Sequence, residues 1–142
     1  MPAEPVIQIA GPWTHRSVTA NGSRFHVASM GEGPLVLLLH GFPEFWWTWR
    51  HQLVTLSEAG YRAVAVDLRG YGGSDKPPRG YDLITSAADA AGLIRALGEA
   101  NAIVVGTTGA ASPHGRLPRT SPRPYAGSRS SRWPIPCGCA PG

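Results

Sequence analysis

The chain has 142 residues and a formal net charge of +4. Its length gives one small domain, whereas single α/β domains commonly reach roughly 200–250 residues. Residues 1–105 hold all nine acidic and eight of the 13 basic residues, and so carry a net charge of −1. The positive charge belongs to the C-terminal segment, which argues against a nucleic-acid-binding domain.

No targeting or membrane segment is expected. Met1–Glu4 lacks a basic segment followed by an apolar one. The apolar run Leu35–Leu39 is far too short to span a bilayer. A cytoplasmic location is therefore the default expectation. The two cysteines, Cys137 and Cys139, are too close for an easy disulfide and make half a zinc site, so neither a metal nor another cofactor is expected.

The first half of the chain predicts three strands and a helix. Residues 13–20 and 24–29 have strand character, and Asn21-Gly22 between them predicts a hairpin turn. The continuous apolar run 35–39 is typical of a central parallel strand covered on both faces. Apolar residues then recur at helical spacing over 47–59, and Gly60 ends that helix.

A second β-α-β unit follows. Residues 62–66 predict a buried strand, which ends in the glycine-rich loop 67–75. Residues 83–97 predict a helix, and residues 102–105 predict a further strand. The order β-β-β-α-β-α-β implies an α/β fold, with a mainly parallel sheet and helices on both faces, over a domain of residues 1–105.

Residues 106–142 have a different composition. Seven of these 37 residues are proline, and Leu117 and Ile135 are the only aliphatic residues apart from alanine. The segment has neither helical nor strand periodicity, so it has no face to bury. We predict that this tail is disordered.

The segment His40-Gly41-Phe42-Pro43 follows the apolar strand 35–39 directly. Gly41 allows a sharp turn and Pro43 stiffens the exit from it. A strand that ends in such a turn is typical of an oxyanion hole, in which a backbone N–H binds a developing negative charge. Phe42 is the expected donor. The alternative is an ordinary turn between a strand and a helix.

A second motif, Asp67–Ser74, also closes a strand. Its glycines fit neither the G-x-G-x-x-G pattern nor a phosphate-binding P-loop. A structural role is expected for Asp67, Arg69, Gly70 and Ser74, with Asp67 and Arg69 pairing or capping a turn.

Several aromatic side chains near the first motif have an open role. They either line a pocket mouth or cover the first helix; these are Trp46, Trp47 and Trp49, together with Glu44. No partner at catalytic spacing is found for His15, His26 or His51, so each is predicted to be an ordinary surface or packing histidine.

The two motifs together resemble the epoxide hydrolase branch of the α/β-hydrolase fold family, over about residues 13–106. The segments are HGFPEFWWTWR at 40–50 and DLRGYGGSDKP at 67–77. Phe42 with Glu44 resembles epoxide hydrolases more than haloalkane dehalogenases, which favour Asn at the place of Phe42. Fluoroacetate dehalogenase-like enzymes share much of both motifs and remain an alternative. The resemblance implies a truncated α/β-hydrolase fold.

The resemblance also implies a mechanism and a small epoxide-like substrate. In that family an aspartate attacks an epoxide carbon, and a histidine oriented by a later acid activates the water that hydrolyses the ester. Cap-domain tyrosines polarise the epoxide oxygen. The motif expected after Val105-Gly106 is His-Asp-Trp-Gly-Gly, but the chain has Thr107–Ala111, with Thr108 in the nucleophile's place. No catalytic triad residue is intact, so we expect an inactive chain.

The loss of one base after the Gly106 codon explains this departure. When one base is restored, the codons of Thr107, Thr108 and Gly109 permit His, Asp and Trp, and those of Ala110 and Ala111 permit two glycines. With wobble bases chosen towards the family, the shifted frame then encodes a helix-like segment (LAAWSLAAYIAP) and a strand-like one (RLAVISM). The tail is therefore predicted to be out of frame.

One alternative belongs to another class of protein. Arginines interleaved with Tyr125 and Trp133 are a weak sign that the tail of a non-catalytic fragment binds nucleic acid. Out-of-frame GC-rich sequence gives the same composition, so no nucleic-acid or membrane partner is expected. The sequence does not predict an oligomeric state.

Overall fold

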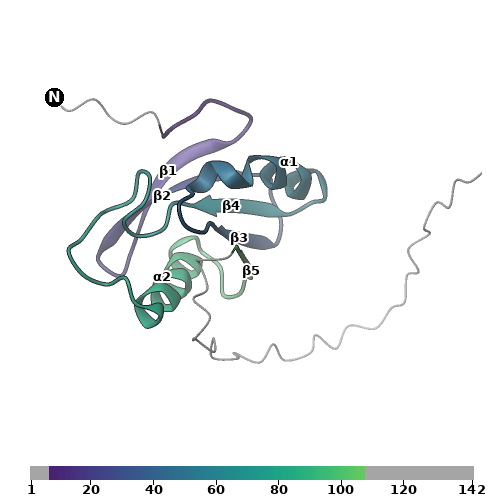
Figure 1. The fold of residues 1–142 in the computed structure, drawn as a ribbon. Helices are drawn as coiled ribbons and strands as arrows, with labels where there is room; N and C mark the ends of the chain where they lie inside the picture. The colour runs from purple at the N-terminus through teal and green to yellow at the C-terminus, as the bar shows by residue number, and fades with distance from the viewer. Residues whose placement is uncertain (1–6, 108–142) are drawn as a thin grey trace, which may run out of the picture.

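The computed structural model describes residues 7–107, which form one sheet with helices packed against it (Figure 1). The elements follow the predicted order β-β-β-α-β-α-β. They are β1 (Thr14–Ala20), β2 (Ser23–Met30), β3 (Leu35–Leu39), the 3₁₀ helix η1 (Trp46–Trp49), α1 (Arg50–Glu58), β4 (Arg62–Val66), α2 (Leu83–Ala96) and β5 (Ile103–Gly106).

The sheet is mixed. Its strand order is β1-β2-β4-β3-β5. Strand β3 pairs in parallel with β4 and β5, whereas β2 pairs antiparallel with β1 and with β4. The expected α/β sheet is present, but half of its pairings are antiparallel rather than a small minority. The reason is that the N-terminal hairpin joins the same sheet. Its strand β2 pairs with β4, which adds two antiparallel pairings to the two parallel ones.

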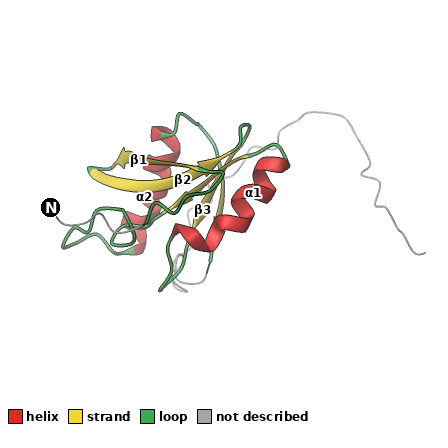
Figure 2. Ribbon diagram, turned by 90° about the horizontal axis from the view of Figure 1, so that it is seen from above, coloured by secondary structure: helices red, strands yellow, loops and turns green. Residues whose placement is uncertain are grey.

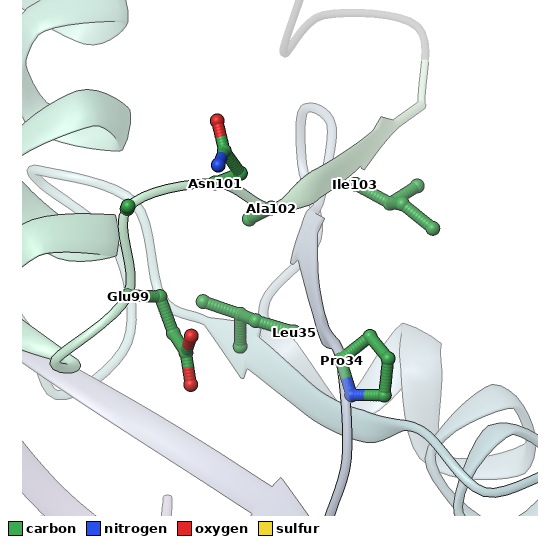
Figure 3. Close-up of a pocket in the computed structure, with 7 residues that line it drawn as sticks. Pro34, Leu35, Glu99, Asn101, Ala102 and Ile103 are labelled. Carbon is green, nitrogen blue, oxygen red and sulfur yellow. The ribbon is translucent and has the colours of Figure 1, made fainter. Parts of the chain in front are cut away.

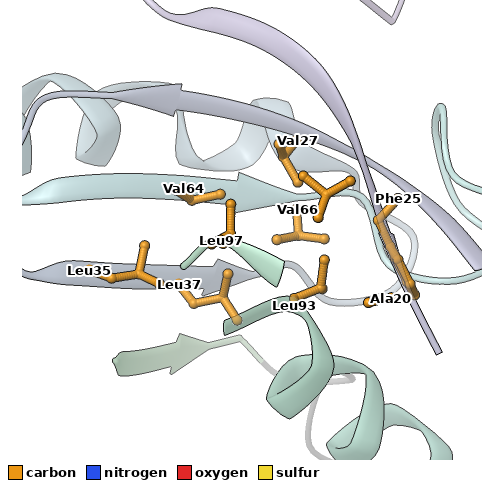
Figure 4. Close-up of a cluster of buried hydrophobic side chains, with 10 residues drawn as sticks. Ala20, Phe25, Val27, Leu35, Leu37, Val64, Val66, Leu93 and Leu97 are labelled. Carbon is orange, nitrogen blue, oxygen red and sulfur yellow. The ribbon is translucent and has the colours of Figure 1, made fainter. Parts of the chain in front are cut away.

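Helices cover both faces of the sheet, as predicted (Figure 2). On one face, side chains of β2, β3 and β4 pack with Leu93 and Leu97 at the end of α2 (Figure 4). On the other face, Ala and aliphatic side chains of the same strands pack with Trp46, Trp49 and Leu53 of η1 and α1. Successive side chains of a strand point to opposite sides, and both sides of β3 are covered. Four of its five residues are therefore buried.

The helix predicted over 47–59 begins as a turn of 3₁₀ helix before α1, and Gly60 follows it with a φ of 86°. Helix α2 begins after Asp82, whose carboxylate accepts the Thr85 N–H at 2.9 Å. Such an N-cap satisfies an amide that has no partner within the helix. No helix within residues 7–107 is long and apolar enough to cross a membrane.

Candidate active-site turn

Three loops meet at the carboxyl edge of the parallel strands. The turn His40–Pro43 follows β3, the loop Asp67–Ser74 follows β4, and Thr107 follows β5. Because β4, β3 and β5 are parallel neighbours, these ends lie side by side. The Thr107 N–H donates to the Leu39 carbonyl at 3.2 Å, which brings the end of β5 against the start of the turn. Ligands of open α/β sheets bind outside this edge.

The Phe42 N–H is the backbone donor of interest in this turn. The Glu44 N–H donates to the Gly41 carbonyl at 2.9 Å and closes the turn around the cis Phe42–Pro43 peptide. The Phe42 side chain is 75% exposed. Within residues 7–107 the Phe42 N–H makes no hydrogen bond. An N–H without a protein partner is available to bind a negatively charged group.

The buried side chain of His40 holds this turn in place. Its buried ring accepts the Leu68 N–H at Nε2 (3.0 Å), so its proton lies on Nδ1 and donates to the Gly41 carbonyl (2.9 Å). Burial lowers the pKa of His40 below 6.5, against the opposing effects of the Gly41 hydrogen bond and of Asp67 and Glu44. Both ring nitrogens are occupied by backbone groups, so His40 holds the turn to the next loop rather than acting as a base.

Asp67 is the centre of the second loop. Its fully buried carboxylate accepts the Trp46 N–H (2.7 Å), the Gly73 N–H (2.9 Å) and His26 Nδ1 (2.8 Å). Burial raises the pKa of Asp67, but the hydrogen bonds together outweigh it and hold the pKa below the usual 3.8. The ionised carboxylate thus joins the start of η1, the glycine-rich loop and β2.

The other residues of this loop also make hydrogen bonds that hold the fold together. Ser74 Oγ accepts the His26 N–H at 2.9 Å and donates to the Asp67 carbonyl. Gly70 has a φ of 86°, which favours glycine. Arg69 pairs with Asp89 of α2 through two hydrogen bonds of 2.8 Å, and so Asp67 and Arg69 have separate partners.

Two histidines extend this network through hydrogen bonds that the sequence did not indicate. His26 is buried and bonds Asp67, and its Nε2 lies 3.1 Å from Nδ1 of His15. The other nitrogen of His15 lies 2.9 Å from the Ile9 carbonyl. The burial of His26 agrees with the predicted packing role, but the sequence did not indicate its hydrogen bond to Asp67. The one available signal was its place in a strand, two residues before the buried Ala28 on the same face.

The tryptophans near the turn belong to the core. Trp46 and Trp49 are buried beneath α1, and Trp46 Nε1 donates to the Ile7 carbonyl at 2.8 Å. Of the two open roles, covering the first helix is the one these contacts support. Glu44 is exposed, with Oε2 3.4 Å from the Gly41 nitrogen and 3.5 Å from Thr107 Oγ1.

Thr108, in the predicted nucleophile position, and the cysteine pair lie outside the described residues, as does most of the predicted disordered tail. Within residues 7–107 no three His, Cys, Asp or Glu side chains are grouped so that they could hold a metal ion.

A family profile described as "alpha/beta hydrolase fold" matches residues 34–107. The chain belongs to this family. Its relatives include Epoxide hydrolase 3 of Siraitia grosvenorii, 50% identical over 94 residues that make up 65% of this chain and 30% of the relative. Epoxide hydrolase B of Mycobacterium tuberculosis is 44% identical over 98 residues, or 65% of this chain and 28% of the relative.

Solved α/β-hydrolase structures give the same result. An epoxide hydrolase from an endophytic Streptomyces has 50% identity and a TM-score of 0.66, covering 68% of this chain and 30% of that one. An epoxide hydrolase from Vigna radiata has 48% identity and a TM-score of 0.65, over 67% and 32% of the two chains. These matches confirm the resemblance. The chain spans about a third of the length of the relatives it matches.

Proposed function

We propose that this chain is the oxyanion-binding N-terminal part of an epoxide hydrolase and that, as written, it does not hydrolyse epoxides. The observation that carries the proposal is the free Phe42 N–H at the carboxyl end of β3. It lies next to the end of β5, after which the family places its nucleophile. Several relatives that are 44–50% identical over this region are named epoxide hydrolases.

The proposed chemistry of the complete enzyme has two steps. An aspartate oxygen attacks an epoxide carbon, the C–O bond breaks, and the ring oxygen takes a proton to become a hydroxyl group. A histidine then removes a proton from water, which attacks the ester carbonyl. The Phe42 N–H stabilises the resulting oxyanion, a contribution of about 3 kcal/mol for one such donor. As this intermediate collapses, the bond between the carbonyl carbon and the substrate oxygen breaks, and the histidinium gives that oxygen its proton, which releases a diol. The remaining carboxyl proton returns to the group that protonated the ring oxygen and leaves the aspartate ionised.

The chain as written lacks the groups for either step. Thr108 offers a hydroxyl in place of the carboxylate, and a hydroxyl needs an adjacent base to act as a nucleophile. The residues of a catalytic triad act as a unit, so an isolated oxyanion donor is not expected to give measurable turnover.

A single lost base after the Gly106 codon is part of the proposal, because it accounts for Thr107–Ala111 in place of His-Asp-Trp-Gly-Gly. A high-accuracy read of the gene across codons 104–112 and through the downstream DNA tests it. A restored base with an open frame would make this chain a sequence error in a full-length gene. A base that is truly missing would make the gene a broken copy. A downstream frame closed early by stop codons would contradict both versions.

The activity is tested by expressing the gene as written and with one base inserted after codon 106. We expect only the second product to convert an aryl epoxide to its diol. Release of halide from fluoroacetate or a haloalkane, without epoxide turnover, would favour the dehalogenase alternative. Diol formation by the chain as written would overturn the proposed inactivity.

Two further predictions concern the surroundings of the protein. A cytoplasmic location remains a prediction, which cell fractionation of the native organism checks.

The absence of nucleic-acid binding is tested by measuring the binding of the 106–142 peptide to DNA or RNA at several salt concentrations. Binding by arginines would weaken steeply with added salt.

A further inference from the structure

A group of titratable side chains lies beside β1 and β2, where His15 and His26 contact each other and His26 contacts Asp67. The hollow at the amino end of β3 differs in this respect (Figure 3). It has a volume of about 370 Å³, and its lining holds one titratable side chain, Glu99. Glu99 already pairs with Arg62 at 3.5 Å. The histidine pair is therefore the place with further chemistry to explain.

The histidine pair is the middle of a line of three polar contacts. Asp67 Oδ2 lies 2.8 Å from His26 Nδ1, and His26 Nε2 lies 3.1 Å from His15 Nδ1. The other nitrogen of His15, Nε2, lies 2.9 Å from the Ile9 carbonyl oxygen. The two ring planes differ by 18° and their centres are 5.1 Å apart, so ring nitrogens rather than ring faces meet. The line connects the glycine-rich loop with the chain before β1.

This line needs one proton more than two neutral imidazoles supply. Both of its ends are acceptors, because Ile9 offers a carbonyl oxygen and Asp67 is an ionised carboxylate that also binds two backbone N–H groups. Three hydrogen bonds between two such ends require three protons on the ring nitrogens, whereas each neutral imidazole carries one. All three bonds therefore form only when one ring is an imidazolium, whose charge the Asp67 carboxylate balances.

Loss of the third proton acts at the Ile9 end of the line. The bond between His26 and Asp67 is kept, because hydrogen bonds to an ionised group are the stronger ones. His15 then donates to His26, which leaves the lone pair of His15 Nε2 facing the Ile9 oxygen at 2.9 Å. Two acceptors at this distance repel each other, and the ring nitrogen has no donor.

The chain before β1 depends on few contacts of this kind. We call residues 7–13 the N-terminal segment; it is the dark purple loop before β1 in Figure 1. Within the part of the chain that the structure describes, it makes no backbone–backbone hydrogen bond. Indole N–H groups hold it instead: Trp46 donates to the carbonyl of its first residue at 2.8 Å, and Trp13 donates to the Ile9 carbonyl at 2.9 Å. Losing the histidine contact at Ile9 therefore weakens its attachment.

We propose that the histidine pair is a proton-operated clasp for the N-terminal segment. The protonated pair holds the segment over Trp46, and loss of one proton releases its contact with Ile9. Histidine is the side chain whose charge changes between about pH 5 and 8. The clasp is therefore closed at the acid end of this range and open at the other end. The inference does not depend on the proposed function.

Other titratable side chains on the elements around the pair are engaged elsewhere. Arg16 is next to His15 in β1 and so points to the opposite face of the sheet. Arg24 of β2 bonds to the loop after β4, and both ring nitrogens of His40 bond to backbone groups. The N-terminal segment and η1 contain no titratable side chain. Three side chains of the loop after β4 bond to groups outside the pair; these are Arg69, Asp75 and Lys76.

The proton count is tested by a pH titration of the full 142-residue chain, labelled with nitrogen-15 at histidine. Nuclear magnetic resonance distinguishes protonated from unprotonated ring nitrogens. We expect three of the pair's four ring nitrogens to be protonated at pH 5.5 and two at pH 8. A count that does not change between these pH values would overturn the inference, and so would four protonated nitrogens at pH 5.5.

Release of the N-terminal segment is measured by hydrogen exchange of the Trp13 indole N–H. His15→Ala removes the clasp at a half-buried position, and His51→Ala, at an exposed position on α1, is the matched control. At pH 5.5 the parent should exchange about tenfold more slowly than His15→Ala, as expected for one hydrogen bond from a charged group. At pH 8 the two should exchange at nearly the same rate. His51→Ala should match the parent at both pH values.

Comparison at a single pH removes the intrinsic pH dependence of exchange. Equal rates in the parent and His15→Ala at pH 5.5 would contradict the clasp, and so would a difference that stays the same at pH 8. Overall stability is not the measure, because His40 also titrates in this range. The nitrogen titration of the parent needs no variant and decides the inference even where His15→Ala fails to fold.

Discussion

At the scale of single residues, the side chain of Asp67 connects three separate parts of the chain. Its carboxylate accepts three hydrogen bonds without exposure to water. Asp67→Asn replaces one acceptor oxygen with a donor and leaves at least one buried N–H unpaired, which costs about 3 kcal/mol. We expect a corresponding drop in the urea midpoint at pH 7. Asp75→Asn, an exposed change in the same loop, should cost under about 1 kcal/mol.

The same residue predicts an acid dependence. The folded pKa of Asp67 lies below its usual 3.8, so its contribution to stability is present above that value. The contribution is lost as the pH falls through the folded pKa. Urea midpoints between pH 3 and 6 should fall with acid more steeply in the parent than in Asp67→Asn. Parallel curves would show that the carboxylate is not ionised in the folded chain.

His40 predicts a second pH effect, in a higher range. Burial lowers its folded pKa below 6.5, so beneath that pH the unfolded chain binds a proton that the folded chain does not. The parent should therefore lose stability as the pH falls from about 7.5 to 5. His40→Gln removes this titration, so the parent's advantage over the variant should shrink towards pH 5. An advantage that grows instead would mean that His40 is protonated in the fold.

The residues that sequence analysis located are those with local signals. The prediction that Phe42 is the donor rests on the strand before it and on the Gly and Pro beside it. The hydrogen bond of His26 was not predicted because its partner Asp67 lies 41 residues away, and only the pairing of β2 with β4 brings them together. Hydrogen bonds that depend on such long-range pairing leave no periodic mark on the sequence.

At the scale of elements, helix α2 is attached to the loops by one buried ion pair. Asp89 accepts two hydrogen bonds from Arg69 and one from Asn21 of the hairpin turn. Asp89→Ala leaves the partly buried Arg69 guanidinium without this partner, which costs roughly 1–3 kcal/mol. Adding Arg69→Met should recover much of that loss in urea unfolding. A double variant no better than the single one would show that the pair is not the source.

Element types and order were predictable because each rests on local periodicity. The runs at 35–39 and 62–66 are continuous and apolar, and 83–97 repeats apolar residues at helical spacing. The number of parallel and antiparallel strand pairs was not predictable, because the sequence of β2 does not indicate which strand it pairs with. Its antiparallel pairing with β4 follows from the whole sheet. The 3₁₀ start of α1 coincides with the Trp46 N–H bound by Asp67.

At the scale of the whole molecule, the ordered sheet ends before the position at which the family has its nucleophile. The sheet is ordered through β5, and both its faces are packed up to β3. The turn proposed to bind the oxyanion is held by contacts that come from residues 40–44 and 68. The proposed nucleophile belongs after β5, where the sequence departs from the family. A well-formed turn therefore does not imply an active chain.

This separation predicts the outcome of the simplest repair. Thr108→Asp places a carboxylate in the nucleophile position, but no histidine, late acid or cap tyrosine that matches the family accompanies it in the sequence. Because catalytic groups act as a unit, we expect neither diol formation nor a covalent ester detectable by mass spectrometry after incubation with an aryl epoxide. The base-restored gene, assayed in parallel, should give both. An ester on the single variant would mean that the 142-residue chain suffices to bind and open an epoxide, and the proposed dependence on the further catalytic groups of the family would then be wrong.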